Sequence, residues 1–184
     1  KAIFESLLVR NKASIRVTDL SRKEEIKAAL EASDSPLAAS GLVKEQGHFA
    51  GYDLFVEGAI TIQDESSQLV APTLDLQGDE QVLDACAAPG GKTAHMASYL
   101  TSGKVVALDL YDHKLDLIQE NARRLGVADR VQTQKLDARK VHEFFEKDFF
   151  DKILVDAPCS GIGLLRRKPD IKYNKETADF ASLQ

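Results

Sequence analysis

The sequence has no tryptophan, a single methionine and only two cysteines, Cys86 and Cys159. Two cysteines cannot form the set of disulfide bridges that stabilises small secreted domains, so we expect a reduced, cytoplasmic setting. They are not arranged as a Cys-x-x-Cys pair, and the sequence therefore predicts no zinc or other metal site. It also contains no apolar run long enough to span a membrane, and its start has no apolar segment typical of a signal peptide.

A surplus of positive charge is lacking as well. The net charge of −5 argues against a protein that binds nucleic acid without selectivity. A local basic cluster is present all the same, and we interpret it either as a contact for RNA phosphates or as a solvated surface. Its members are Arg166, Arg167, Lys168, Lys172 and Lys175. The 184 residues suffice for one full domain, or for a small domain and most of another, and Lys1 in place of an initiator methionine indicates a piece of a longer chain.

The most informative stretch is a loop of small residues between a strand pattern and a helix pattern. It runs from Asp84 to Thr93 and reads Asp-Ala-Cys-Ala-Ala-Pro-Gly-Gly-Lys-Thr. Glycines tolerate positive φ, and small side chains let a ligand come close to backbone N–H groups, as in nucleotide-binding loops. A dinucleotide-binding Gly-x-Gly-x-x-Gly is absent. A P-loop is matched only in its second half, because Cys86 stands where the first glycine belongs, so a P-loop NTPase stays open as an alternative.

Four predicted strands share one feature, which is an aspartate at the end. They are Gln81–Asp84, Val105–Asp109, Val131–Asp137 and Lys152–Asp156. Continuous apolar runs suit strands buried on both faces, and helical patterns at 93–100, 113–125 and 141–145 separate the strands. This alternation predicts a parallel α/β sheet with all four aspartates at its carboxyl edge, where such sheets bind ligands. Four carboxylates fit a nucleoside better than the single magnesium-binding aspartate of a P-loop enzyme.

The first part of the chain predicts a small α+β accessory module, residues 1–57, in front of a nucleotide-binding domain at 58–184. Its predicted elements are a helix at Ile3–Arg10, a strand at Ala13–Val17, a helix at Glu24–Leu30 capped by Asp19 or Ser21, a loop at 33–41, and short strands at Leu42–Lys44 and Tyr52–Phe55. A further helix, Glu65–Leu74, is predicted after Asp64 and ahead of the first strand of the parallel sheet.

Two motifs, Asp84–Thr93 and the later Asp156-Ala-Pro-Cys-Ser-Gly161, together resemble the RNA 5-methylcytosine methyltransferases of the Sun/NOP2/NSUN type, and among them the bacterial ribosomal RNA small-subunit methyltransferase B group. The likeness extends to 62–70 and 167–170 and is weak near the start of the chain. It implies a Rossmann-like, S-adenosylmethionine-dependent methyltransferase fold, incomplete at the C-terminus, behind a small module that helps to seat RNA. The implied activity is methylation of carbon 5 of cytosine in RNA, with ribosomal RNA as the expected partner.

The resemblance also implies which residues hold the cofactor, S-adenosylmethionine. The loop residues assigned to it are Cys86, Ala87, Ala88, Pro89, Gly90, Gly91 and Lys92. Asp109 can accept hydrogen bonds from both ribose hydroxyls of a nucleoside, or else cap the helix that follows it. Asp137 matches the family residue that faces the adenine amino group, or else caps a helix at Val141–Phe145. Asp84 either braces the loop or touches the ligand, and Cys86 taken alone is typical of a small buried packing residue.

The Pro-Cys pair at Cys159 bears on the chemistry. Carbon 5 of cytosine is a poor nucleophile, and the known solution is covalent: a cysteine thiolate adds to carbon 6, after which carbon 5 takes the methyl group. The resemblance implies that Cys159 assists release of the product and that the attacking cysteine lies in a later Thr-Cys-Ser motif, which this sequence does not contain. Asp156 is expected to hydrogen-bond the cytosine ring or contact the cofactor, or else to brace the loop.

We therefore expect an RNA cytosine-5 methyltransferase whose present 184 residues are inactive alone. The alternative from another class, besides the P-loop NTPase, is a catalytically incomplete module that binds cofactor or RNA.

Overall fold

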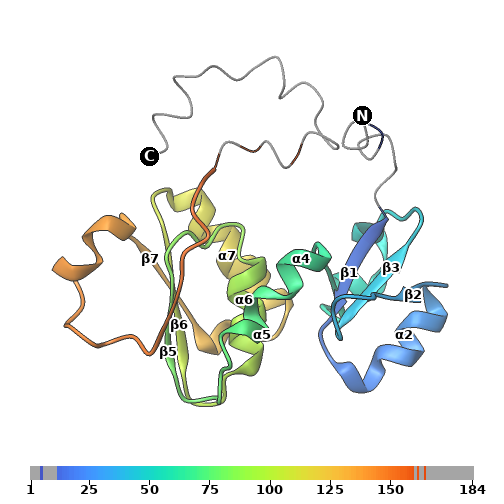
Figure 1. Ribbon diagram of the computed structural model, residues 1–184, viewed down its shortest axis with the longest axis horizontal. Helices are drawn as coiled ribbons and strands as arrows, with labels where there is room; N and C mark the ends of the chain where they lie inside the picture. The colour runs from blue at the N-terminus through green and yellow to red at the C-terminus, as the bar shows by residue number, and fades with distance from the viewer. Residues whose placement is uncertain (1–4, 6–11, 160, 162–163, 165–184) are drawn as a thin grey trace. The chain divides into compact units, whose positions relative to one another are not determined.

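The structure is a computed structural model, and it describes residues 5, 12–159, 161 and 164 (Figure 1). Residues 12–156 form one compact unit that contains two sheets, and the described residues outside it are treated by themselves. The basic cluster at 166–175 and, apart from Glu5, the predicted helix Ile3–Arg10 lie outside the described residues. No described helix is both long and apolar enough to cross a membrane.

The first sheet is antiparallel, and its strands stand in the order β2-β3-β1-β4. Its elements are β1 (Ala13–Val17), η1 (Leu20–Arg22), α2 (Lys23–Ala29), β2 (Ser33–Asp34), β3 (Gly41–Lys44), η2 (Phe49–Gly51) and β4 (Ile60–Ile62). The carboxylate of Asp19 accepts the backbone N–H of Ser21 at 2.9 Å and so caps the 3₁₀ turn that leads into α2. Ile26 of α2 packs with Ile15 and Leu42 of the sheet, which gives this small sheet its own apolar core.

The prediction of a strand at Tyr52–Phe55 was wrong. The segment forms helix α3 (Asp53–Val56). Leu54 and Phe55 are adjacent in sequence, and both pack against the first core. Successive residues of a strand point to opposite faces, whereas a helical turn allows both side chains to meet the same core. Gly58, at φ +79°, follows the end of this helix.

The predicted helix Glu65–Leu74 is broken into α4 (Glu65–Gln68) and α5 (Val70–Thr73). Pro72 has no N–H to donate to the carbonyl of Gln68, four residues earlier, and a continuous helix would need that hydrogen bond. The break therefore follows from the position of a single proline.

The predicted boundary between the accessory module and the larger domain falls at residue 58. Strand pairing in the first sheet runs past that position, since Ile60 pairs with Val17 and Ile62 pairs with Ile15. The predicted loop at 33–41 likewise includes the two-residue strand β2. The division into residues 1–57 and 58–184 stays a prediction.

The second sheet is parallel throughout, as predicted, with the strand order β7-β6-β5-β8. Its elements are β5 (Gln81–Asp84), α6 (Gly91–Tyr99), β6 (Lys104–Asp109), α7 (Asp112–Arg124), η3 (Ala128–Arg130), β7 (Val131–Lys135), η4 (Ala138–Glu143) and β8 (Lys152–Leu154). The helix predicted at Val141–Phe145 corresponds only in part to the 3₁₀ helix η4, which begins at Ala138 and ends at Glu143. Asp137 and Asp156 lie just beyond the ends of β7 and β8. This alternation of parallel strands and helices is a Rossmann-like α/β fold.

Both faces of the parallel sheet are covered, which explains why its strands are continuous apolar runs. Val82 and Val105 pack with Met96 of α6 and Ile118 of α7 in the larger core cluster. The residues next to them in the strands point to the opposite face. There Leu83, Val106, Leu108 and Leu136 pack against Phe145 and Phe150. Figure 1 shows α6 and α7 on one side of the sheet and the segment around η4 on the other.

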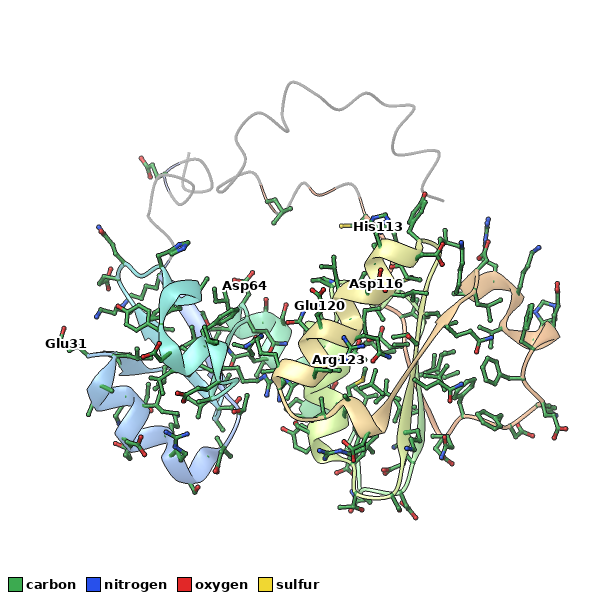
Figure 2. The ribbon with its side chains drawn as sticks, turned by 180° about the vertical axis from the view of Figure 1, so that it is seen from behind. Glu31, Asp64, His113, Asp116, Glu120 and Arg123 are labelled. Atoms are coloured by element: carbon green, nitrogen blue, oxygen red, sulfur yellow. The ribbon has the colours of Figure 1, made fainter. Side chains whose placement is uncertain are left out.

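Helix α7 separates the larger core from solvent. Its buried residues are Ile118 and Ala122. Figure 2 shows the labelled, exposed side chains of its opposite face, which are His113, Asp116, Glu120 and Arg123. The apolar face of α7 thus rests on the sheet, close to the loop between β5 and α6.

Candidate functional site

The loop between β5 and α6 is packed tightly at one glycine and is open at the next. Gly90 has φ +98°, and a Cβ atom on it would lie 2.9 Å from the Cα of Ile118, so the fold itself requires glycine there. A Cβ atom on Gly91 would meet no other atom within 4 Å. Packing does not require glycine at position 91, and the space beside it is available to a ligand. The Ala88–Pro89 peptide bond within this loop is cis.

Asp84 lies beneath the loop and is buried. Its carboxylate accepts the hydroxyl of Thr93 at 2.7 Å and the backbone N–H of Cys86. Burial raises the pKa of Asp84 to about 6, although these two hydrogen bonds oppose the rise. The contacts join both ends of the loop, which supports the interpretation of Asp84 as a brace.

Lys92 brings the two sequence motifs together. Its ammonium group lies 2.6 Å from Oδ2 of Asp156, a residue 64 positions later in the chain. Lys92 belongs to the first motif and Asp156 begins the second, so the two motifs meet at the carboxyl edge of the parallel sheet. The pair is partly exposed, with side-chain exposures of 24% and 54%.

Cys86 shows which strand-end carboxylates gather around the loop. Its side chain is partly buried, and burial is the main reason why the pKa of its thiol is raised. The negative charges of Asp84, Asp109 and Asp156 raise that pKa further. The charges of three of the four predicted carboxylates therefore act on one thiol, which is held in its neutral form.

Asp109 and Asp137 differ in the hydrogen bonds and ion pairs that neighbouring residues make with their carboxylates. Oδ1 of Asp109 accepts the N–H of Tyr111 at 3.2 Å and lies 3.7 Å from the ammonium of Lys114. Tyr111, not Asp109, is the N-cap residue of α7. Asp137 caps η4 and is paired with Arg139 at 2.6 Å, which lowers the pKa of Asp137 to about 2. The capping alternative thus describes the contacts of Asp137 better than those of Asp109.

Cys159 is exposed, and neither cysteine is part of a disulfide. Cys159 follows the 12–156 unit and is described apart from it. Among the residues that the structure describes, no group of three or more histidine, cysteine, aspartate or glutamate side chains could hold a metal ion.

Three residues of the site were missed by the sequence analysis. The side-chain amide of Asn121 donates to the carbonyl of Pro89 at 2.7 Å. Leu110 and Tyr111 follow Asp109 and are exposed to 50% and 54%, which leaves an apolar surface beside the carboxylate. An apolar pair directly after a strand-end aspartate is a signal in the sequence, whereas nothing near Asn121 in the sequence points to Pro89.

Comparisons with known proteins agree with this geometry. The model of the family described as 16S rRNA methyltransferase RsmB/F matches residues 71–184. A probable ribosomal RNA small subunit methyltransferase B of Bacillus subtilis is 51% identical over 155 residues, which are 84% of this chain and 34% of the relative. The ribosomal RNA small subunit methyltransferase B of Pseudomonas syringae is 40% identical, over 85% of this chain and 35% of the relative. The chain thus spans about a third of the length of these curated relatives.

Solved structures show the same fold. A methyltransferase homologue from Pyrococcus horikoshii is 31% identical, with a TM-score of 0.75 over 92% of this chain and 58% of that one. NSun6 from Pyrococcus horikoshii, solved with SFG, has a TM-score of 0.85 over 98% of this chain and 71% of that one. At 20% identity the second likeness concerns the fold alone.

Proposed function

Since the chain belongs to the 16S rRNA methyltransferase RsmB/F family, we propose that the intact protein transfers a methyl group from S-adenosylmethionine to carbon 5 of a cytosine in ribosomal RNA. The observation that supports this most directly is the ion pair between Lys92 and Asp156, because it joins the two motifs at one edge of the parallel sheet. We place the reaction in the cytoplasm, where Cys86 and Cys159 stay reduced.

The residues at this edge fit S-adenosylmethionine. The open space beside Gly91 admits a ligand close to the backbone at the start of α6. Within the described residues both polar contacts of the Asp109 carboxylate use Oδ1, so Oδ2 is left to accept a ribose hydroxyl. The exposed Leu110 and Tyr111 provide an apolar surface for the adenine ring. Asp137 would face the adenine amino group while Arg139 holds its carboxylate.

The chemistry we propose is covalent. When bound, S-adenosylmethionine supplies the methyl group. A cysteine thiolate adds to carbon 6 of the cytosine, carbon 5 takes the methyl group, a base removes the proton from carbon 5, and the thiolate leaves. Asp156 hydrogen-bonds the cytosine ring so that N3 stays protonated, and Lys92 fixes the carboxylate of Asp156 in place. Cys159 assists the release of the product, while the attacking cysteine belongs to a motif that this sequence lacks.

The antiparallel sheet and its helices are proposed to seat the RNA, in keeping with the small module that the sequence predicts. The P-loop alternative gains no support. A P-loop threonine binds magnesium, whereas Thr93 is buried and donates its hydroxyl to Asp84.

Calorimetry of the intact protein with S-adenosylmethionine tests the proposal. We expect binding that Asp109→Ala weakens by about 1–3 kcal/mol, since a hydrogen bond to a charged group is lost. Asp116→Ala is the matched control, because Asp116 is an exposed aspartate on the face of α7 opposite the buried Ile118 and Ala122. Tight magnesium-dependent ATP binding without any response to S-adenosylmethionine would refute the proposal.

A further inference from the structure

Arg124, the last residue of α7, connects that helix to the antiparallel sheet. Its guanidinium donates to the carbonyls of Phe55 at 2.8 Å and Ile60 at 3.2 Å, and to the hydroxyl of Thr61 at 3.2 Å. The guanidinium carbon also lies 4.0 Å from the centre of the Phe55 ring. A planar fork of donors satisfies these acceptors together, which the single ammonium of a lysine cannot do.

The backbone reinforces this junction. Gly58 lies between Phe55 and Ile60, and a Cβ atom on it would come within 1.9 Å of the carbonyl oxygen of Arg124. The chain that enters β4 is therefore in direct contact with the end of α7, and the position of one fixes the position of the other.

Asn121, one turn earlier in α7, extends the connection to residues 86–92, in the loop between β5 and α6 and the first turn of α6, which we call the cofactor loop. Its Oδ1 accepts from Arg124 at 3.2 Å, and its Nδ2 donates to the carbonyl of Pro89 at 2.7 Å. Because the oxygen of the amide is committed to Arg124, its nitrogen faces Pro89. Pro89 directly precedes Gly90, on which a Cβ atom would lie 2.9 Å from the Cα of Ile118 of the same helix.

A continuous series of contacts therefore runs from β4 through Arg124 and Asn121 to the Pro89 carbonyl. We propose that Asn121 and Arg124 are positioning residues, through which the antiparallel sheet sets the geometry of the cofactor loop, residues 86–92. This inference rests on the proposed function, because it assumes that the loop binds S-adenosylmethionine. Neither residue is assigned any contact with the cofactor or the RNA. Their effect is to hold one carbonyl, and with it the open space beside Gly91, in the arrangement that binds.

Two variants interrupt the series at different points. Asn121→Asp keeps the acceptor for Arg124 but places a carboxylate oxygen against the Pro89 carbonyl. Arg124→Lys removes the fork and leaves Asn121 intact. The matched control is Arg130→Lys, because Arg130 also donates to two backbone carbonyls, those of Leu100 and Gly126, and has no contact with the loop.

The first measurement is hydrogen–deuterium exchange of the intact protein without cofactor. We expect Asn121→Asp and Arg124→Lys to speed exchange in peptides that cover residues 85–94, and Arg130→Lys to leave it unchanged. The second is the Kd for S-adenosylmethionine by calorimetry. It should rise about tenfold in Asn121→Asp, as expected when one hydrogen bond is replaced by repulsion, with a melting temperature no lower than that of Arg130→Lys.

The double variant Asn121→Asp, Arg124→Lys should bind S-adenosylmethionine no more weakly than the weaker single variant, because both changes act through the same carbonyl. Additive losses, or loop exchange and Kd that match those of Arg130→Lys, would overturn the inference and leave the proposed function standing. An intact wild-type protein that does not bind S-adenosylmethionine would overturn the proposed function and this inference together.

Discussion

The carboxyl ends of β5 and β7 carry the same residue type in opposite surroundings. Asp84 at the end of β5 is buried and joins two ends of a loop through Thr93 and the N–H of Cys86. Asp137, just beyond β7, is held by Arg139, its neighbour two positions along. A buried carboxylate of this kind contributes to the stability of the fold, because its removal leaves the donors that bind it without an acceptor. A partly buried carboxylate whose partner is an exposed arginine exchanges that partner for water at little cost.

The largest effect on stability is expected at Gly90, in the loop that follows β5. Gly90→Ala places a Cβ atom 2.9 Å from the backbone of Ile118 and forces alanine to φ +98°, so we expect a loss of about 3 kcal/mol in the free energy of unfolding. Gly91→Ala should leave that free energy unchanged or slightly raised, yet weaken S-adenosylmethionine binding, because its methyl group occupies the open space. Urea denaturation and calorimetry measure the two quantities, and equal destabilisation by both variants would contradict the packing argument.

A pH series from 4 to 6 sharpens the comparison, because the β5–α6 region buries two titratable groups. Burial raises the pKa of Asp84 from 3.8 to about 6. Between these values the folded state holds a proton that the unfolded state has released, so this group lowers stability as pH rises. Burial and the charge of Arg16 lower the pKa of His95 from 6.5 to about 3. Between those values only the unfolded state holds the proton, so this group raises stability as pH rises.

The two slopes oppose each other in the wild-type protein. Asp84→Asn removes the decrease that Asp84 causes as pH rises. From pH 4 to pH 6 the free energy of unfolding of this variant should therefore increase by about 2 kcal/mol relative to that of the wild-type protein. His95→Gln removes the second and should show the opposite change of similar size. Denaturant midpoints measured across this range give the slopes. Parallel pH profiles for the wild-type protein and both variants would show that neither group is perturbed as described.

The smallest effect is expected at the β7 end. Asp137→Ala removes the cap of η4, whereas Asp137→Asn keeps a capping side chain and loses only the charge pairing with Arg139. Thermal unfolding should show a slight decrease for the alanine variant and almost none for the asparagine variant. A decrease as large as that of Gly90→Ala would mean that the two strand ends are equivalent after all.

The sequence predicts the parallel sheet well because its signals are local. Val105–Leu108 is a continuous apolar run that is followed by Asp109, and both lie in β6. The segment Tyr52–Phe55 has the same length but is interrupted by Asp53, so its apolar residues fitted a strand as well as a helix.

The site is less predictable, because its contacts join distant residues. Lys92 and Asp156 are 64 positions apart, and Asn121 and Pro89 are 32 positions apart. The family resemblance brought Asp156 into the site, but no pattern in the sequence identified Lys92 as its partner. Asp137 is the opposite case, since the capping alternative could be stated from the sequence because the capped segment follows it directly.

The β5–β8 pairing has a consequence for the order of events during folding. β5 pairs with β6, from which it is separated by α6 alone. It also pairs with β8, which is far away in the sequence: the N–H of Gln81 donates to the carboxylate of Asp151, 70 positions later. Contacts of such sequence separation close large loops and form late. We therefore expect the amides of β5 and β6 to be protected first in a refolding experiment with pulsed hydrogen exchange, and those of β8 last. Simultaneous protection of β6 and β8 would argue against this order. In the expected order, with β8 last, the site is completed only in the final step, when Asp156 arrives beside a Lys92 that is already in place.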